Sequence, residues 1–278
     1  MAAILPTFGL PSSCSGIPPS LSSRFEFNTK LSFMPQVLEI YRALRVMVKQ
    51  AIGLEPIVLV KKTMPLRYHG NTAYGGWSIP THLIKQESTV VDVGLGEDIS
   101  FSQSLINLYD CSVHGFDPTP KAIEFVEKSN INKFTLHKYG LGGKSRTERF
   151  FLPNQDTHVS GSIAHAEHLG AHEISVNLLS LDDLFKLIAT DTISLLKIDI
   201  EGAEYEFFES PDFEKLASKI DVICVEFHHR WKQFGPKATR SAVKKLEKAG
   251  FSCVWRALTS NEEFTFMRTA HYTDLRIN

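Results

Sequence analysis

Short apolar runs alternate with amphipathic stretches from residue 89 to the end of the chain. The runs TVVDV (89–93), ISLLKIDI (193–200) and DVICVEF (221–227) are largely apolar, which is typical of parallel strands that are covered on both faces. A stretch with helical spacing follows the first run, and the alternation of strand and helix continues along the chain. This order predicts an α/β fold with a doubly wound, mostly parallel sheet, whose ligands bind outside the carboxyl ends of the strands.

The remaining strand-like runs predict smaller pieces of antiparallel structure. FSCVWRA (251–257) and EFTFMR (263–268) are expected to close the chain as an antiparallel pair, and TERFFLP (147–153) is expected to be one arm of a hairpin. Ser180 is predicted to cap the helix that follows it. The sheet is therefore expected to end in an antiparallel C-terminal hairpin strand, with helices on both of its faces.

The N-terminal part of the chain departs from this pattern. Residues 1–30 are rich in Ser and Pro and contain one acid, Glu26, which is typical of a disordered tail and equally of an organelle transit peptide. Residues 34–52 have the i, i+3, i+4 apolar spacing of an amphipathic helix. We expect this helix to pack on the main domain; a membrane-surface or partner helix is the alternative. The chain then divides into the tail, a helical or extended segment (31–69) and the main domain (70–278).

The composition narrows the classes of function. The 278 residues carry 30 basic and 31 acidic side chains, so no basic surplus is present to bind nucleic acid. The four cysteines form no CxxC pair, and we expect buried free thiols in a reducing compartment. No apolar run approaches the ~20 residues of a membrane-spanning helix. We expect the protein in the cytoplasm, or in a plastid or mitochondrion if the tail is a transit peptide.

The first strand of the main domain runs directly into a glycine turn. Gly94 and Gly96 would let the backbone approach a ligand closely, but a dinucleotide fingerprint needs a third glycine where Ile99 stands. Glu97 and Asp98 would repel a phosphate by roughly 4 kcal/mol at ~4 Å and an effective dielectric near 20. S-adenosylmethionine has no phosphate and carries a sulfonium and an ammonium, so we predict that it is the ligand. Helix capping is the alternative role for the two acids.

An acid also stands at the end of the second strand. Asp117 follows Gly96 by about 20 residues, where a carboxylate hydrogen-bonds the hydroxyls of a ribose. The sequence Asp-Pro-Thr-Pro (117–120) would also form a turn on its own, and we favour the ribose role. Phe116 or Pro118 is expected to border the adenine. Asp92 and Asp199 complete the set of residues predicted to bind the cofactor.

A second group of charged residues gathers at the carboxyl ends of two later strands. Asp199 and Glu201 follow one buried strand, and Glu226 and His228 end the next. Asp199, Glu201 and His228 are candidates for a general base, and His228 ranks first because its ordinary pKa lies nearest neutrality. Asp199, Glu201 and Glu226 could instead hold Mg²⁺, but their spacing is no dedicated metal motif and we expect no metal. Glu204 and its neighbours suit the acidic first turn of the next helix.

Four histidines lie in the stretch HVSGSIAHAEHLGAHE (158–173). We expect a loop on the substrate side with exposed histidines. Zinc is the alternative, because three of them have helical spacing. The four residues are His158, His165, His168 and His172.

The stretches VVDVGLGEDISFS, HGFDPTP, SLDDLF and LKIDIEGAE together resemble the FkbM family of methyltransferases. The resemblance covers about residues 70–268 and implies a Rossmann-like class I methyltransferase fold with a seven-stranded sheet. It also implies that the glycine turn and Asp117 hold S-adenosylmethionine, that Asp199 lies near the methyl group, and that a hydroxyl of a sugar or natural product is methylated. Asp98 departs from the family, which usually has a glycine there. YGGW (74–77) resembles a subgroup and is expected to cover the cofactor.

Other classes of function stay open beside this one. A silent module could hold a cofactor or partner without turnover, although the glycine turn, Asp117 and Asp199 together disfavour it. The acids in the turn and the missing glycine oppose an NAD-dependent oxidoreductase, and the neutral charge opposes a nucleic-acid methyltransferase. We therefore predict a small-molecule hydroxyl acceptor, no nucleic-acid partner and no membrane span, while the oligomeric state is left open.

Overall fold

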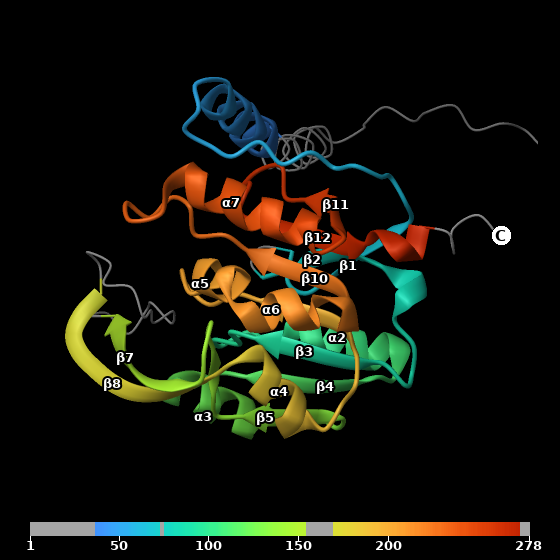
Figure 1. Ribbon diagram of the computed structural model, residues 1–278, viewed down its shortest axis with the longest axis vertical. Helices are drawn as coiled ribbons and strands as arrows, with labels where there is room; N and C mark the ends of the chain where they lie inside the picture. The colour runs from blue at the N-terminus through green and yellow to red at the C-terminus, as the bar shows by residue number, and fades with distance from the viewer. Residues whose placement is uncertain (1–36, 73–74, 154–168, 273–278) are drawn as a thin grey trace, which may run out of the picture.

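A computed structural model describes residues 37–72, 75–153 and 169–272 of the chain. Seven strands form its central sheet. They are β3 (Thr89–Val93), β4 (Ser112–Phe116), β5 (Phe134–His137), β9 (Ile193–Ile198), β10 (Ile220–Glu226), β11 (Phe251–Arg256) and β12 (Glu263–Arg268). The order across the sheet is β11-β12-β10-β9-β3-β4-β5, and β12 pairs antiparallel with both of its neighbours (Figure 1). The predicted doubly wound sheet with an antiparallel C-terminal hairpin is confirmed.

Helices cover both faces of this sheet (Figure 1). They are α2 (Ser100–Tyr109), α3 (Pro120–Ser129), α4 (Leu181–Ile188), α5 (Glu204–Glu209), α6 (Pro211–Leu216) and α7 (Gly235–Lys248). Helices α4 to α7 share one core with Val91, Val93 and Ile198, whereas α2 shares another with Val90 and Leu195. Neighbouring residues of a strand point to opposite faces, so the sheet is buried on both sides, as its apolar runs predict.

Two smaller sheets and three 3-10 turns complete the described part. These are the hairpin of β1 (Leu66–His69) and β2 (Trp77–Pro80), the sheet of β6 (Gly140–Leu141), β7 (Arg146–Pro153) and β8 (Leu169–Leu179), and the turns η1 (Thr81–Leu83), η2 (Ala217–Lys219) and η3 (Thr269–Tyr272). Strand β7 pairs antiparallel with β8, which confirms the predicted hairpin arm. The two strands project from the body beside α3 (Figure 1).

The N-terminal helix spans residues 37–51 and lies at the edge of the molecule, above α7 and β11 (Figure 1). The amphipathic helix is confirmed, but it contacts the main domain through residues other than its apolar stripe. Val46 is buried, whereas Ile40, Leu44 and Val48 of the stripe are all more than half exposed. Periodicity reveals that a helix has an apolar face, and only the position of the helix decides what that face contacts.

Polar contacts attach this segment to the main domain. The buried carboxylate of Glu55 lies 2.6 Å from Nε2 of His229 and accepts hydrogen bonds from Arg230 and from the buried amide of Asn261. The amide nitrogen of Gln50, on the last turn of the helix, donates to Oδ1 of Asn261 at 3.3 Å. Burial alone would raise the pKa of Glu55, but these partners outweigh it and hold the pKa below its ordinary value.

Two predictions about the whole chain can be compared with the described residues. Cys111, Cys224 and Cys253 are buried free thiols, as predicted, while Cys14 lies outside the described residues. Over residues 37–72, 75–153 and 169–272, no helix has the length and apolarity needed to cross a bilayer.

Candidate active site

A cavity opens at the carboxyl ends of β3, β4 and β9. The connection after β3 runs through α2 on one face of the sheet, and the connection after β9 runs through α5 on the other. Doubly wound folds bind their ligands at such a point. The cavity encloses about 800 Å³, counting the solvent at its mouth. Its walls include residues 93–96, 117–119 and 199–201 from the three strand ends. The small sheet adds Phe150 and Leu178, which the sequence analysis did not identify.

Gly94 and Gly96 both line the cavity and both have positive φ, +80° and +54°. A Cβ atom on Gly94 would lie 1.6 Å from the backbone oxygen of Asp199. No side chain fits in that space, so the end of β3 touches the end of β9 through a glycine. The glycine turn predicted from sequence is therefore required by the packing of two strands as well as by access to the cavity.

Asp117 lies in the cavity wall with its carboxylate already saturated. Oδ2 accepts hydrogen bonds from the backbone nitrogens of Leu95 and Gly96 at 3.0 and 3.1 Å. Oδ1 accepts from the backbone and the hydroxyl of Thr119 at 2.8 and 2.6 Å. Since a carboxylate offers about four acceptor sites, Asp117 here holds the glycine turn in shape. Pro118 lines the cavity beside it.

The two acids of the turn have different surroundings. Glu97 is exposed and does not line the cavity, whereas Asp98 does. Oδ1 of Asp98 accepts from the backbone nitrogen of Ser100 at 2.8 Å, so capping accounts for one oxygen. Oδ2 is buried, and among the described residues it has no hydrogen-bond partner. It lies near Gly75, which also lines the cavity. A buried carboxylate oxygen of this kind suits a cationic ligand group.

Asp92 does not line the cavity, although it is one of the predicted cofactor residues. Its Oδ1 lies 3.1 Å from Nζ of Lys197 on the neighbouring strand, and its Oδ2 accepts from the hydroxyl of Ser102 at 2.6 Å. Lys197 also donates to the backbone oxygen of Gly94 at 2.7 Å and does line the cavity. The sequence analysis missed this pair, although a lysine in an apolar strand signals a buried partner.

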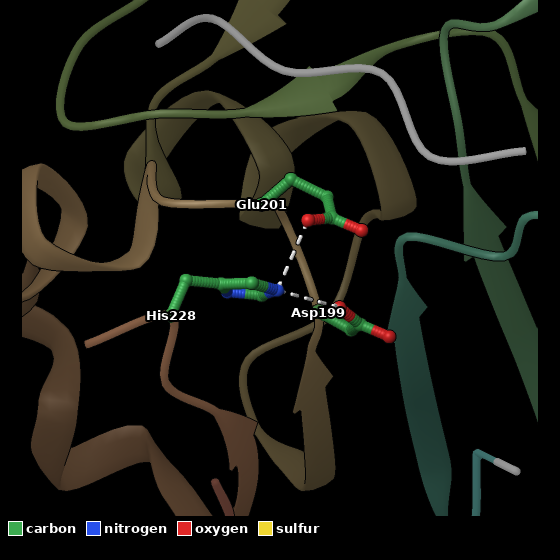
Figure 2. Close-up of side chains that lie close together, drawn as sticks. All are labelled: Asp199, Glu201 and His228. Atoms are coloured by element: carbon green, nitrogen blue, oxygen red, sulfur yellow. Dashed lines mark ion pairs between the residues drawn. The ribbon is translucent and has the colours of Figure 1, made fainter. Parts of the chain in front are cut away.

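Asp199, Glu201 and His228 converge at the edge of the cavity (Figure 2). Nε2 of His228 lies 3.1 Å from Oε2 of Glu201 and 3.9 Å from Oδ1 of Asp199. Asp199 and Glu201 line the cavity, whereas His228 is buried behind them. Glu201 has φ of +51°, a conformation that is uncommon outside glycine and frequent at functional sites. The structure thus brings together the three residues predicted to be catalytic.

Glu204 has a larger role than the first-turn acid expected from sequence. It is fully buried, and its Oε1 accepts from the backbone nitrogen of His228 and lies 3.1 Å from Nδ1 of the same residue. Its Oε2 accepts from the backbone nitrogen of Gly202 at 2.8 Å. The sequence analysis missed this role because the contact joins residues that are 24 positions apart.

Burial and neighbouring charges shift the pKa values in this cluster. Burial acts to lower the pKa of His228, but Glu204 and Glu201 together outweigh it and raise the pKa well above its ordinary value. Burial raises the pKa of Asp199 to about 6, against the opposing effect of Lys197. Burial, reinforced by Asp199, raises the pKa of Glu226 well above its ordinary range. These shifts favour the charged form of His228 beside the carboxylates and bring the pKa of Asp199 closer to neutrality.

The same three side chains could also hold a metal ion. Asp199, Glu201 and His228 each offer one ligand atom, and these atoms lie within 4.8 Å of one another. The metal ligands considered from the sequence were Asp199, Glu201 and Glu226, so His228 takes the place of Glu226 in this set. Oxygen and imidazole ligands together suit several divalent ions.

The remaining predicted residues lie elsewhere or outside the described part. Trp77 of the YGGW stretch is buried in the core against Phe101, with ring centroids 5.7 Å apart, and Tyr74 lies outside the described residues. The predicted histidine cluster also lies outside them, apart from His172, whose backbone forms part of β8. The predictions of a cover over the cofactor and of an exposed histidine loop stay predictions.

Comparison with known proteins identifies the family. The model of the methyltransferase FkbM domain matches residues 92–253, more than half of the chain and all three strand ends of the cavity. The chain belongs to the FkbM methyltransferase family. The predictions of the family and of a Rossmann-like class I methyltransferase fold are confirmed. The family and its fold support S-adenosylmethionine as the cofactor of this protein.

The comparisons also find more distant similarities. A human protein named "Probable methyltransferase-like protein 24" is 25% identical over 194 residues, which cover 68% of this chain and 44% of the human protein. Among solved structures, an rRNA methylase from Streptococcus thermophilus has a TM-score of 0.38 and 15% identity, covering 67% of this chain and 88% of its own. Fibrillarin from Aeropyrum pernix, in complex with S-adenosyl-L-methionine, has a TM-score of 0.37 and 6% identity, with coverage of 77% and 85%.

Proposed function

We propose that this methyltransferase methylates a hydroxyl oxygen of a small molecule. The observation that carries the proposal is the group of Asp199, Glu201 and His228 at the edge of the cavity. A hydroxyl is a weak nucleophile that needs a base, and this group supplies carboxylates where the acceptor would lie. The neutral overall charge supports a small acceptor over a nucleic acid.

S-adenosylmethionine, when bound, supplies a methyl group on a sulfonium, which is already a good leaving group. We assign its site to the glycine turn of Gly94 and Gly96, to Pro118, and to Asp98, whose buried Oδ2 is available to a positive group. Asp117 would act through the turn that it holds. A ribose contact by Asp117 would require one of its four present hydrogen bonds to be exchanged.

We propose Asp199 as the base, in place of His228. Both ring nitrogens of His228 face carboxylates, and its raised pKa favours the imidazolium, which has no lone pair to accept a proton. Asp199 lines the cavity, and its pKa of about 6 leaves it ionised at neutral pH yet basic enough to accept a proton. His228 would orient Glu201 and Asp199, and Glu204 would fix the ring of His228.

The protein then has two tasks in methyl transfer, which are to orient the acceptor and to accept its proton. The cavity wall orients the acceptor hydroxyl, and positioning supplies most of the rate. During transfer of the methyl group from the bound cofactor, Asp199 would take the proton that the acceptor hydroxyl loses. The charged ring of His228, 3.9 Å from Oδ1 of Asp199, offsets the excess of carboxylates around it.

The test is transfer of isotope-labelled methyl groups to a panel of hydroxylated, amine and thiol compounds, with the new linkage assigned by mass spectrometry. We expect oxygen-linked products, and a rate about 10²–10⁴-fold lower for Asp199→Asn with S-adenosylmethionine affinity retained. Glu97→Gln, at the exposed acid of the turn, is the matched control and should keep the rate. Products linked through nitrogen or sulfur would contradict the hydroxyl acceptor. Cofactor binding without turnover across the panel would instead favour the silent module.

A further inference from the structure

A second hollow lies between the N-terminal helix, which is drawn above β11 in Figure 1, and the main domain. It encloses about 2430 Å³, counting the solvent at its open side. Its walls include the helix, residues 58–60, and residues 254–260 at the end of β11 and in the turn after it. Val46, Val58 and Val254 are buried in these walls, so the hollow has an apolar lining where the helix meets the domain.

Basic side chains from three separate parts of the chain line this hollow. Positions 42, 45 and 49 are three and four residues apart, so they share one side of the helix. A fourth follows β10 and a fifth ends β11. Among the described residues, the lining holds two acids, Glu39 and Glu263. The five basic residues are Arg42, Arg45, Lys49, Arg230 and Arg256.

Two of these five charges are already paired within the protein. Lys49 and Arg230 lie 3.7 and 3.1 Å from the buried carboxylate of Glu55. The other three form no ion pair within the described ranges of the chain. A guanidinium group is planar and always charged, and it binds carboxylate and phosphate through two parallel hydrogen bonds. The three unpaired residues are Arg42, Arg45 and Arg256, and together they make the hollow suitable for an anionic group.

The hollow adjoins the cofactor cavity at Gly75, which lines both. On the cavity side, Oδ2 of Asp98 lies 3.6 Å from the place of a Cβ atom on Gly75. On the other side, Tyr68 and Gly76 line the hollow next to it. The two spaces are therefore neighbours, and one elongated molecule can extend from the hollow toward the cavity.

We propose that the hollow binds an anionic group of the methyl acceptor. This inference rests on the proposed function, in which a small hydroxylated molecule is methylated at the edge of the cavity. The acceptor would then be an organic phosphate or carboxylate. Its charged group would contact Arg42, Arg45 and Arg256, and its carbon skeleton would pack on the apolar lining. The chain has 30 basic and 31 acidic side chains, which gives no basic surplus for a polyanion, so we assign the anionic group to a small molecule.

Calorimetric titration of the full chain with 1-naphthyl phosphate tests the site, with S-adenosylhomocysteine in excess to fill the cofactor cavity. 1-Naphthoate carries a carboxylate on the same rings, and 1-naphthol is the uncharged counterpart. We expect one or both anions to bind and 1-naphthol to bind about tenfold more weakly. Tighter binding of the phosphate assigns the group to an organic phosphate, and the reverse order assigns it to a carboxylate. Arg42→Gln/Arg45→Gln should weaken binding of the anions about tenfold, because each exposed charge pair contributes up to about fivefold.

Arg67→Gln/Arg240→Gln is the matched control, since it removes the same two charges at positions that do not line the hollow. It should bind the anions like the wild type. Arg42 and Arg45 are exposed, so circular dichroism should show the same fold in both double variants. The inference is overturned if 1-naphthol binds as tightly as the anions, if no anion binds, or if the two double variants lose affinity equally.

Methyl transfer to matched acceptors with and without an anionic group separates this inference from the proposed function. For an anionic acceptor, Arg42→Gln/Arg45→Gln should raise KM about tenfold and leave kcat unchanged, whereas Asp199→Asn should lower kcat. If uncharged compounds are methylated at oxygen as readily as anionic ones, and the double variant changes neither, the inference fails and the proposed function stands. If the anions bind through the arginines but the methyl group is linked to nitrogen or sulfur, the inference stands and the hydroxyl acceptor fails.

Discussion

At the scale of single residues, the direct contacts of several site residues restrict each of them to one role. Gly94 has no room for a Cβ beside the backbone of Asp199. Both oxygens of Asp117 are used by backbone and hydroxyl donors. His228 is bonded at both nitrogens by acids. These constraints make individual substitutions informative, because each removes one identifiable contact.

Gly94→Ala should abolish cofactor binding and destabilise the fold. The added Cβ would meet the Asp199 oxygen at 1.6 Å, so β3 and β9 must separate at the cavity. Gly250→Ala is the matched control, because Gly250 also has positive φ (+91°) but open space around it. The control should lose only ~1–2 kcal/mol for the backbone conformation. Urea denaturation and calorimetric titration of S-adenosylmethionine measure both effects, and equal losses in the two variants would refute the close-contact explanation.

The pH dependence of turnover should report Asp199. A base must be deprotonated to act, and the pKa of Asp199 is raised to about 6. Turnover should therefore be constant at neutral pH and fall as the pH drops through about 6, roughly tenfold per unit below that value. Asp199→Asn should leave only a slow rate, and this rate should not fall as the pH drops through about 6. If turnover instead fell near the ordinary pKa of an aspartate, the buried carboxylate of Asp199 would be excluded as the base.

At the scale of secondary-structure elements, buried charges fix how strands and segments pair. Asp92 and Lys197 are opposite each other in the parallel register of β3 and β9, and Glu55 joins the N-terminal segment to the strand ends at His229 and Asn261. A shift of one residue in either place would leave a buried charge without its partner, which is costly. These pairs thus select one arrangement of elements that apolar packing alone would specify less sharply.

Lys197→Met should destabilise the protein by about 3–5 kcal/mol, because Asp92 is left buried without a counter-charge. The double variant Asp92→Leu/Lys197→Met should recover most of that loss, since apolar residues often replace a buried ion pair at little cost. Lys61→Met breaks an exposed pair with Glu247 and serves as the control, with a change of ~0–1 kcal/mol. Chemical denaturation measures all three. A double variant no better than Lys197→Met would show that Lys197 acts mainly through Gly94.

At the scale of the whole molecule, one end of the sheet holds the cavity and the edge beside β11 carries the exposed helix (Figure 1). The two features use different residues. Because the proposed cofactor site is lined by turns from three strand ends, cofactor binding is expected to stabilise the main domain as a unit.

S-adenosylmethionine should raise the melting temperature. A ligand at 100 times its dissociation constant adds about 2.7 kcal/mol, or roughly 5–10 °C for a domain of this size. Asp117→Asn should remove most of the shift, because an amide cannot accept all four hydrogen bonds that the carboxylate accepts. Asp191→Asn, at an exposed position, is the control and should keep the shift. An unchanged shift in Asp117→Asn would mean that the turn keeps its shape without the carboxylate.

The sequence by itself determined the order of strands and helices, the antiparallel closing hairpin, the glycine turn and the family. These features follow from local periodicity and from contiguous motifs, which the chain carries whatever its tertiary contacts are. It also brought Asp199, Glu201 and His228 to one edge, because parallel strands end together.

Only the tertiary structure decided the state and partners of these groups. Glu204 raises the pKa of His228, Lys197 pairs with Asp92 outside the cavity wall, and the apolar stripe of the N-terminal helix faces outward. In each case the deciding contact, or its absence, involves residues far apart in the chain. Burial and distance set the energy of such contacts, and neither is encoded in a local pattern.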